Sequence, residues 1–469
     1  MTHDREHEAW LLRRVALLLV LLYLGLAGNR WLRGLPPTSF VELAGVLGYL
    51  LCLRQLHRLL TIMPLYGDES VMPLFGLLLG VGLLLKMRLA PEPGALSAWR
   101  LAVYPAAMVV LAAAAWVCRN RLHWLDNLAW LAGFVALGVL VLVVSHGTRF
   151  RGAMFGPGHT TPTEVIKPLL VVFLAGFLKR RRGLFEVGVF GALWLGVFAL
   201  LLKQSDLGMV VILGALLLSM FFVATGRTRY LLVGLVIAAV GVVLLYYAAP
   251  LPSAAARGQR RVDVWLNPWA DPLKSGFQTV QGMFALRAGG VDGAGFGAGL
   301  ANLTPLVESD FVWVAVAEDL GLLGSWMLLW AYLGLYRRGY RIAALTTEPF
   351  RQRLAVGCVT VLAIQTLLNV GGVVRLVPIT GITLPFLSHG GSSLLVCAAL
   401  LGIVLAVGHD VELGEPGPRR SQRALDALAD DAGVPDPRER GDGSDPRDEG
   451  RPARGRSAAP AHTTIRYRD

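Results

Sequence analysis

The stretch LGMVVILGALLLSMFFVA, from Leu207 to Ala224, decides the fold class of this 469-residue chain. It carries no charged side chain, and its length matches that of a helix crossing a lipid bilayer. A buried strand is excluded, because in lipid every backbone polar group must be paired within its own segment. The whole chain agrees: 55% of its residues are hydrophobic and 16% are charged, against about 25% charged in soluble proteins.

Similar apolar runs recur along the chain and predict an all-α polytopic membrane protein with about twelve transmembrane helices. The second run is the weakest, because Arg54, His57 and Arg58 interrupt its far end, from which long basic side chains can reach the membrane surface. The predicted spans are Leu12–Gly28, Val41–Met63, Val71–Leu89, Trp99–Cys118, Leu128–Ser145, Val165–Leu178, Leu184–Leu202, Leu207–Ala224, Leu231–Ala248, Phe311–Tyr336, Leu354–Val374 and Ser392–Val407.

The charges between these runs predict the orientation of the chain. Basic clusters such as Arg13–Arg14, Lys179–Arg182 and Arg337–Arg341 fall on one side, which the positive-inside rule assigns to the cytoplasm. Both termini are then cytoplasmic, and the long segment Ala249–Ser309 lies outside. The same rule accounts for the net charge of +12, so we expect membrane lipids and no nucleic acid as partners.

Beyond Val407 the composition changes. Residues 408–469 are rich in Pro, Gly, Ser, Asp and Arg and have little to bury, which predicts a disordered cytoplasmic tail. Its mixed charges favour a solvated tail over a docking site.

Ionisable groups at the ends of spans are functional candidates, because they are costly in a membrane. Glu164 and Lys167 are three residues apart on a predicted helix and can pair. A capped helix with a local ion pair explains them as well as a substrate-lining pair does. Asp206 is explained more simply as a helix N-cap than as a catalytic group.

The long outside segment is about sixty residues, which is unusual unless it is functional or partly folded. Four glycines alternate between positions 293 and 299, but no strand precedes them, so they are not a dinucleotide fingerprint. They predict a tight, irregular loop whose backbone approaches another group closely. The basic residues of the segment could hold a phosphate group; they are Arg257, Arg260, Arg261, Lys274 and Arg287.

Asp310 ends this segment at the start of the next apolar run. It could be an ordinary residue at a helix N-terminus. A partly desolvated carboxylate also tends to have a raised pKa, which would suit a general base for a sugar hydroxyl.

Four motifs, in order, resemble those of the SEDS family (shape, elongation, division and sporulation), the RodA/FtsW proteins. One is the long loop, with Asn-Pro-Trp-Ala-Asp-Pro at 267–272, Ser-Gly-Phe-Gln at 275–278 and Glu-Ser-Asp-Phe at 308–311. The others are Thr161–Lys167, Gln204–Gly208 and Pro378–Ser393. The resemblance runs over about 71–407. It implies a ten-helix core, preceded by two extra helices in residues 1–70.

The resemblance implies a peptidoglycan glycosyltransferase in the bacterial cytoplasmic (inner) membrane. Such enzymes polymerise lipid II, a disaccharide-peptide on undecaprenyl pyrophosphate, into glycan strands at the outer membrane face. They usually work with a class B penicillin-binding protein, which is a transpeptidase.

It also implies the site. Asp310 stands at the position of the essential aspartate and would be the catalytic base. The charge of the leaving pyrophosphate could be met by Arg261, Arg287 or a divalent cation (Mg or Mn), for which no dedicated ligand cage is evident. The predicted substrate-binding residues are Glu164, Lys167, Arg261, Lys274, Gln278, Gln281, Arg287, Glu308 and Ser392.

The sequence departs from the family pattern beside that aspartate, which indicates a divergent branch. Glu308-Ser309 replaces His-Thr, and the Glu308 carboxylate could raise the pKa of Asp310. Ser388-His389 replaces Ser-Tyr, and Glu318-Asp319 replaces Glu-Glu.

Two other functions compete with this interpretation. A transporter of a lipid-linked precursor would use Glu164, Lys167 and Asp206 inside the membrane, but the repeat symmetry common in transporters is not evident. A non-catalytic scaffold for a transpeptidase would tolerate the altered residues beside Asp310.

Overall fold

The computed structural model describes residues 2–35, 37–63, 68–90, 98–150, 153–155, 162–179, 183–247 and 253–414. The predicted tail is thus described only as far as Gly414, and its predicted disorder lies outside the described residues. Residues 91–97 and 156–161, which connect predicted spans, also lie outside the described residues.

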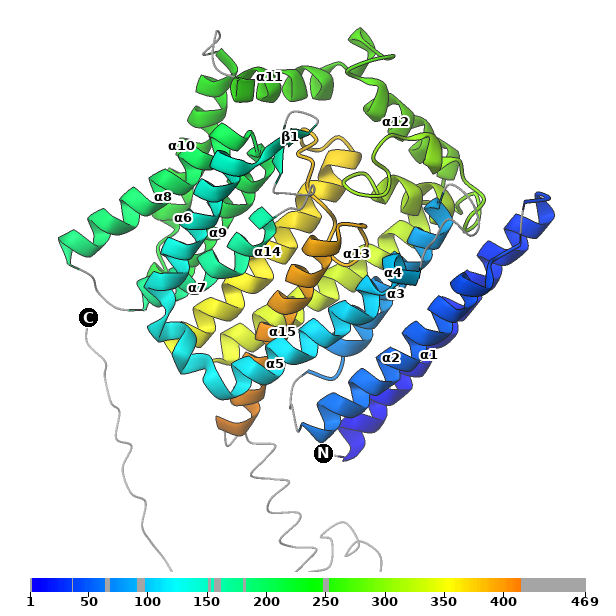
Figure 1. Ribbon diagram of the computed structural model, residues 1–469, viewed down its shortest axis with the longest axis horizontal. Coiled ribbons are helices and arrows are strands. Elements are labelled where there is room, and N and C mark those ends of the chain that lie inside the picture. Colours follow the sequence, from blue (N-terminus) through cyan, green and yellow to red (C-terminus); the bar gives the residue numbers. More distant parts are fainter. Residues whose placement is uncertain are drawn as a thin grey trace, which may run out of the picture. The chain divides into compact units, whose positions relative to one another are not determined.

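Helices occupy all twelve predicted places (Figure 1). They are α1 Thr2–Leu32, α2 Phe40–Ile62, α3 Val71–Leu89, α5 Val103–Asn127, α6 Ala129–His146, α7 Ile166–Leu178, α8 Leu184–Gln204, α9 Leu207–Thr225, α10 Thr228–Tyr247, α13 Trp313–Leu345, α14 Pro349–Val373 and α15 Gly391–Gly414. Within the described residues, eight helices are long and apolar enough to cross a membrane, or nine if the sharply bent α5 counts as one span. The chain is a multi-pass membrane protein, as predicted, whereas the count of twelve spans stays a prediction.

The remaining elements are short. α4 (Ala98–Leu101) leads into α5, and η2 (Pro162–Val165) leads into α7. β1 (Thr148–Phe150) and β2 (Ala153–Phe155) form an antiparallel pair, a small exception to the all-helical architecture.

The long outside segment is largely folded, which the sequence left open. It contains α11 (Ser253–Leu266), η3 (Pro268–Ala270), α12 (Phe277–Gly289) and η4 (Ala301–Leu303). Figure 1 shows α11 running across one end of the helical bundle, over the ends of the long helices. The irregular loop predicted from the glycines is therefore confined to the stretch after α12.

The interior helices are α3, α14 and α15, whose apolar windows are about four-fifths buried (83%, 78% and 78%). The corresponding window of α1 is only 17% buried. Large apolar side chains such as Leu17, Leu184 and Phe185 stay exposed on the outer helices. An apolar outer surface of this kind is stable only when lipid covers it.

The glycine-rich stretch after α12, residues 290–299, contacts α13 at a break in that helix. Gly321, inside α13, has φ +66°, so the helix loses its regular hydrogen bonds there. The loop restores them: the N–H groups of Leu322 and Leu323 donate to the carbonyls of Gly290 and Val291 at 3.0 and 3.2 Å. A Cβ on Gly293 (φ +84°) would lie 2.5 Å from the Asp319 carbonyl oxygen. The predicted close backbone approach is confirmed, and its target is α13.

A buried arginine ties the same stretch to α3. Arg88 Nε donates to Asp319 Oδ2 at 2.9 Å, and its Nη2 donates to the carbonyl of Gly299 at 2.8 Å. The N–H groups of Gly297 and Gly299 donate to the same carboxylate at 2.9 and 3.1 Å. The loop is thereby clamped between α3 and α13.

The two N-terminal helices dock on α3 through polar contacts. Arg30 of α1 pairs with Glu42 of α2 at 2.8 Å and donates to the carbonyl of Met87 at 2.8 Å. Tyr49 of α2 donates to the carbonyl of Gly76 at 2.6 Å. Because the Arg30–Glu42 pair is buried, losing either partner would leave an uncompensated charge, so the two helices are held as a pair.

Candidate functional site

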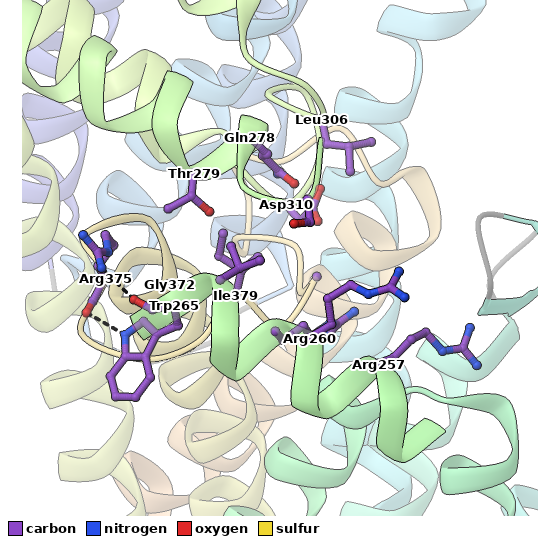
Figure 2. A pocket seen from close by; sticks show the side chains of 14 residues that line it. Arg257, Arg260, Trp265, Gln278, Thr279, Leu306, Asp310, Gly372, Arg375 and Ile379 are labelled. Atoms are coloured by element: carbon purple, nitrogen blue, oxygen red, sulfur yellow. Dashed lines mark hydrogen bonds between the residues drawn. The ribbon is translucent and has the colours of Figure 1, made fainter. Parts of the chain in front are cut away.

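A cavity of about 310 Å³ lies where the folded outside segment meets the connection between α14 and α15. Figure 2 shows α11 along one side of it, carrying Arg257 and Arg260, with Asp310 and Gln278 on the other side. Its lining residues are Arg257, Arg260, Arg261, Val264, Trp265, Ser275, Gln278, Thr279, Leu306, Asp310, Gly372, Arg375, Ile379 and Gly381.

Helical spacing places three of the arginines on α11. Residues 257, 260 and 261 are three and four positions apart, so they share one face of that helix. Arg261 Nη1 donates to the carbonyl of Thr380 at 2.7 Å, and Arg257 donates to the hydroxyl of Ser205. These bonds fix the basic face of α11 against the bundle.

A fourth arginine, Arg375, comes from the residues just after α14. It has φ +60°, and its Nη2 donates to the carbonyl of Trp265 at 2.6 Å. Trp265 Nε1 in turn donates to the carbonyl of Arg375 at 2.9 Å, as Figure 2 shows. Sequence reasoning missed Arg375. An arginine on the predicted outer side, where basic residues are scarce, was the available signal.

Asp310 lies half-buried before the start of α13. The N-cap of α13 is Val312 and makes no side-chain cap, so Asp310 does not serve as the cap of that helix. Ser309 Oγ donates to Asp310 Oδ1 at 2.7 Å, and Asn369 Nδ2 donates to the Asp310 carbonyl at 2.9 Å. The backbone at this position is thus anchored to α14, while the carboxylate faces the cavity.

Gly381 lies beside both the Asp310 carboxylate and the Arg261 guanidinium. It has φ +74°, and a Cβ there would lie 3.6 Å from both Arg261 Nη2 and Asp310 Oδ2. Burial lowers the pKa of Arg261, while the nearby carboxylates of Asp206 and Asp310 act to raise it. The arginine remains charged, because its ordinary pKa is above 12.

Gln278, at the start of α12, presents an unpaired donor. Its Nε2 is buried without a hydrogen-bond partner among the described residues. Buried polar atoms are nearly always paired, so an orphan donor in a cavity marks a position where a ligand oxygen can bind.

Asp206 is the N-cap of α9, as predicted, since the N–H of Met209 donates to its Oδ1 at 3.0 Å. Burial raises its pKa, Glu164 adds to that rise, and Lys167 and Arg261 oppose it. Lys167 Nζ pairs with Glu164 Oε2 at 2.6 Å, so the predicted pair forms. These charged residues are not among those that line the cavity.

The other predicted substrate-binding residues are not among those lining the cavity. Lys274 and Arg287 are exposed, and Gln281 and Ser392 are half-buried. Glu308 Oε2 pairs with Lys86 Nζ at 2.8 Å. A neighbouring cation therefore offsets the negative charge expected to act on Asp310.

Two of the departures from the family pattern contact each other. The backbone N–H and Nδ1 of His389 donate to the Glu308 carbonyl at 3.0 and 2.7 Å, and Ser388 Oγ donates to the Ser309 carbonyl. Burial, together with the charge of Lys86, lowers the pKa of His389 to about 3. A neutral histidine therefore holds the backbone immediately before Asp310.

Across the part of the chain that the structure describes, no three or more His, Cys, Asp or Glu side chains are placed to hold a metal ion. The lining residues of the cavity include one carboxylate, Asp310, among four arginines. This arrangement suits an anionic ligand and a proton acceptor better than a bound cation.

Comparison with known proteins decides the family. The model of the FtsW/RodA/SpoVE family, described as cell cycle proteins, matches residues 86–412. The chain belongs to this family. Its resemblance to the SEDS proteins is thereby confirmed, and the match includes both the folded outside segment and the cavity.

Relatives within the FtsW/RodA/SpoVE family carry enzyme names. The peptidoglycan glycosyltransferase RodA of Mycobacterium tuberculosis is 32% identical over 376 residues, covering 73% of this chain and 78% of the relative. The probable peptidoglycan glycosyltransferase FtsW of Geobacter metallireducens is 36% identical, covering 59% of this chain and 75% of the relative.

Solved structures of the family share the fold. A chain from a peptidoglycan synthase complex that coordinates polymerization and crosslinking is 28% identical, with a TM-score of 0.60, covering 73% of this chain and 98% of its own. The rod shape determining protein RodA of Thermus thermophilus is 26% identical, with a TM-score of 0.53, covering 73% and 97%.

Proposed function

We propose that this chain is a peptidoglycan glycosyltransferase that polymerises lipid II at the outer face of the bacterial cytoplasmic membrane, with both termini in the cytoplasm. The names of its relatives support the activity. The observation that carries the proposal is the cavity in which one carboxylate, Asp310, meets four arginines. A transfer from a sugar pyrophosphate needs this combination of a proton acceptor and anion-binding groups.

In the proposed reaction, Asp310 accepts the proton of the acceptor's sugar hydroxyl. The freed oxygen attacks the anomeric carbon of the donor, and the bond from that carbon to the pyrophosphate oxygen breaks. A positioned general base typically contributes 10²- to 10⁴-fold to such a rate. Lipid pyrophosphate is a good leaving group, so the reaction depends less on a general acid.

The arginines of the cavity would receive the pyrophosphate. Guanidinium groups form paired, charge-assisted hydrogen bonds to phosphate oxygens. Arg261 is held by Thr380 and faces Asp310, so its position is set before the substrate arrives. The unpaired Nε2 of Gln278 offers one more donor for a substrate oxygen.

The cavity would hold only the reacting end of lipid II, since about 310 Å³ lies at the small end of ligand pockets. The polyprenyl chains would lie along the apolar outer helices. A divalent cation, Mg or Mn, would have to arrive with the pyrophosphate, because the lining residues form no cation cage.

The proposed partner is a class B penicillin-binding protein, which would cross-link the strands made here. The structural relative belongs to a synthase complex that coordinates polymerization and crosslinking, and this likeness supports the assignment.

The test is polymerisation of lipid II by the purified protein, alone and with a co-expressed partner, read on a gel. We expect Asp310→Ala to lower the rate at least about 100-fold. Asp292→Ala removes an exposed carboxylate from the same segment and should leave activity unchanged. Equal activity of Asp310→Ala and wild type would remove the catalytic assignment. A protein that makes no polymer in any form, yet supports a partner's activity, would favour the scaffold.

A further inference from the structure

A second cavity lies between the two N-terminal helices, outside the family match. It measures about 460 Å³, more than the cavity at Asp310. Its lining residues are Ala9, Leu12, Arg13 and Ala16 of α1 with Leu50, Leu53, Arg54, His57 and Arg58 of α2.

This cavity is a groove between α1 and α2, and one part of it is apolar. Leu50 and Leu53 line it on α2, and the small side chains of Ala9 and Ala16 leave room on α1. The apolar lining positions span about 5–6 Å along each helix, from 50 to 53 on α2 and from 12 to 16 on α1. A segment of acyl chain fits a wall of this length and character.

The other part of the groove is basic. Arg13, Arg54 and Arg58 are exposed there, and none of them forms an ion pair with a described residue. The nearby acid, Glu8, is buried and is engaged by His57 Nδ1 at 3.0 Å. The groove therefore gathers from two helices three positive charges that no described carboxylate pairs with.

These charges stand at the helix ends that the distribution of lysine and arginine assigns to the cytoplasm. The positive-inside rule accounts for basic residues on that side. It does not account for three arginines that converge on one apolar groove. Basic pockets between membrane helices on the cytoplasmic side are typical sites for anionic lipid headgroups.

We propose that this groove binds an anionic phospholipid of the cytoplasmic leaflet. Its phosphate lies between Arg13, Arg54 and Arg58, and one acyl chain lies along Leu50 and Leu53. The site is separate from the Asp310 cavity and does not depend on the polymerase assignment.

The test measures lipid binding by the full-length protein in neutral detergent, using native mass spectrometry and the melting midpoint. The probes are cardiolipin, phosphatidylglycerol, phosphatidylcholine and inorganic phosphate. We expect the two anionic lipids to bind and to raise the midpoint. Phosphatidylcholine should bind at least about tenfold more weakly, and inorganic phosphate should have little effect.

The decisive variant is Arg54→Gln with Arg58→Gln, which should weaken anionic lipid binding roughly 30-fold. The matched control is Arg337→Gln with Arg341→Gln, two exposed arginines at the same spacing on α13. A second variant, Ala16→Phe, fills the apolar part and keeps every arginine. It should also weaken lipid binding at least about tenfold, because it displaces the acyl chain.

Three outcomes would overturn the proposal. The first is that Arg54→Gln with Arg58→Gln binds anionic lipid as the wild type does, or that the control pair loses binding equally. Lipid binding would then depend on general surface charge and not on the groove. Equal binding of phosphatidylcholine would remove the role of the anionic headgroup. A midpoint rise with inorganic phosphate that Ala16→Phe leaves intact would identify a site for a free phosphate instead.

Discussion

Two aspartates near the start of α13, Asp310 and Asp319, differ in what surrounds their carboxylates. Asp319 is fully buried and accepts hydrogen bonds from Arg88 and from the N–H groups of Gly297 and Gly299. Asp310 is half-buried, accepts a bond from Ser309 and faces a cavity with four arginines.

The difference separates a structural carboxylate from the proposed catalytic one. The oxygens of Asp319 are all engaged, so they have no capacity for a substrate proton, and their bonds hold the loop to α3 and α13. The carboxylate of Asp310 lines a cavity where a substrate can bind. Access to a cavity is therefore a better guide to function here than charge alone.

The largest expected effect is a loss of stability when Asp319 loses its arginine partner. Arg88→Met would leave the Asp319 carboxylate buried without its cation, which costs about 3–5 kcal/mol of stability. Asp310→Asn should change stability by less than about 1 kcal/mol. Melting midpoints in detergent would measure both. Similar melting midpoints for the two variants would show that Asp319 is no more important for stability than Asp310.

The next effect concerns the glycines that wrap around Asp319. Gly293→Ala adds a Cβ 2.5 Å from the Asp319 carbonyl in a backbone with φ +84°, so strain and overlap together should cost about 2–4 kcal/mol. Gly290→Ala is the matched control, because it has φ +54° and open space around the added Cβ. Gly290→Ala introduces backbone strain without overlap, so it should lower stability by less than Gly293→Ala does. Equal losses would mean that the close approach to α13 contributes nothing.

The smallest expected effect is a pH dependence of stability that arises from His389, near Asp310. The pKa of His389 is about 3 in the folded protein and 6.5 ordinarily, so as pH falls the unfolded chain takes up the proton first. Its contribution to stability is therefore complete above pH 6.5 and is lost as pH falls toward 3.

His389→Asn keeps a donor near the Glu308 carbonyl and removes this titration. We expect a flatter dependence of the melting midpoint on pH between about 4 and 7 than in the wild type. Parallel curves for the two proteins would show that the contact with His389 does not titrate in this range.

Much of the architecture could be predicted, because it depends on local pattern. Apolar runs of bilayer length gave helices at every predicted place, and Asp206 caps α9. Glu164 and Lys167 pair because a helix brings positions three apart together. The alternating glycines correctly indicated a close backbone approach.

The site was predicted only in part. Asp310, Arg261 and Gln278 share the cavity, but Arg375 joins them from a separate segment. The ion pair of Glu308 with Lys86 and its contact with His389 were not predicted. Neither was the break at Gly321, whose hydrogen bonds come from another segment.

The sequence by itself determined that the chain is a bundle of membrane helices, and it identified Asp310 as the candidate catalytic residue. Run length and short motifs carry that information, and both act over a few residues. Only the tertiary structure decided which carboxylate is enclosed between α3, α13 and the loop and which lines the cavity. Arg88 and Asp319 are 231 positions apart, and a partner at that distance is set by how α3, α13 and the loop pack, which no local pattern specifies.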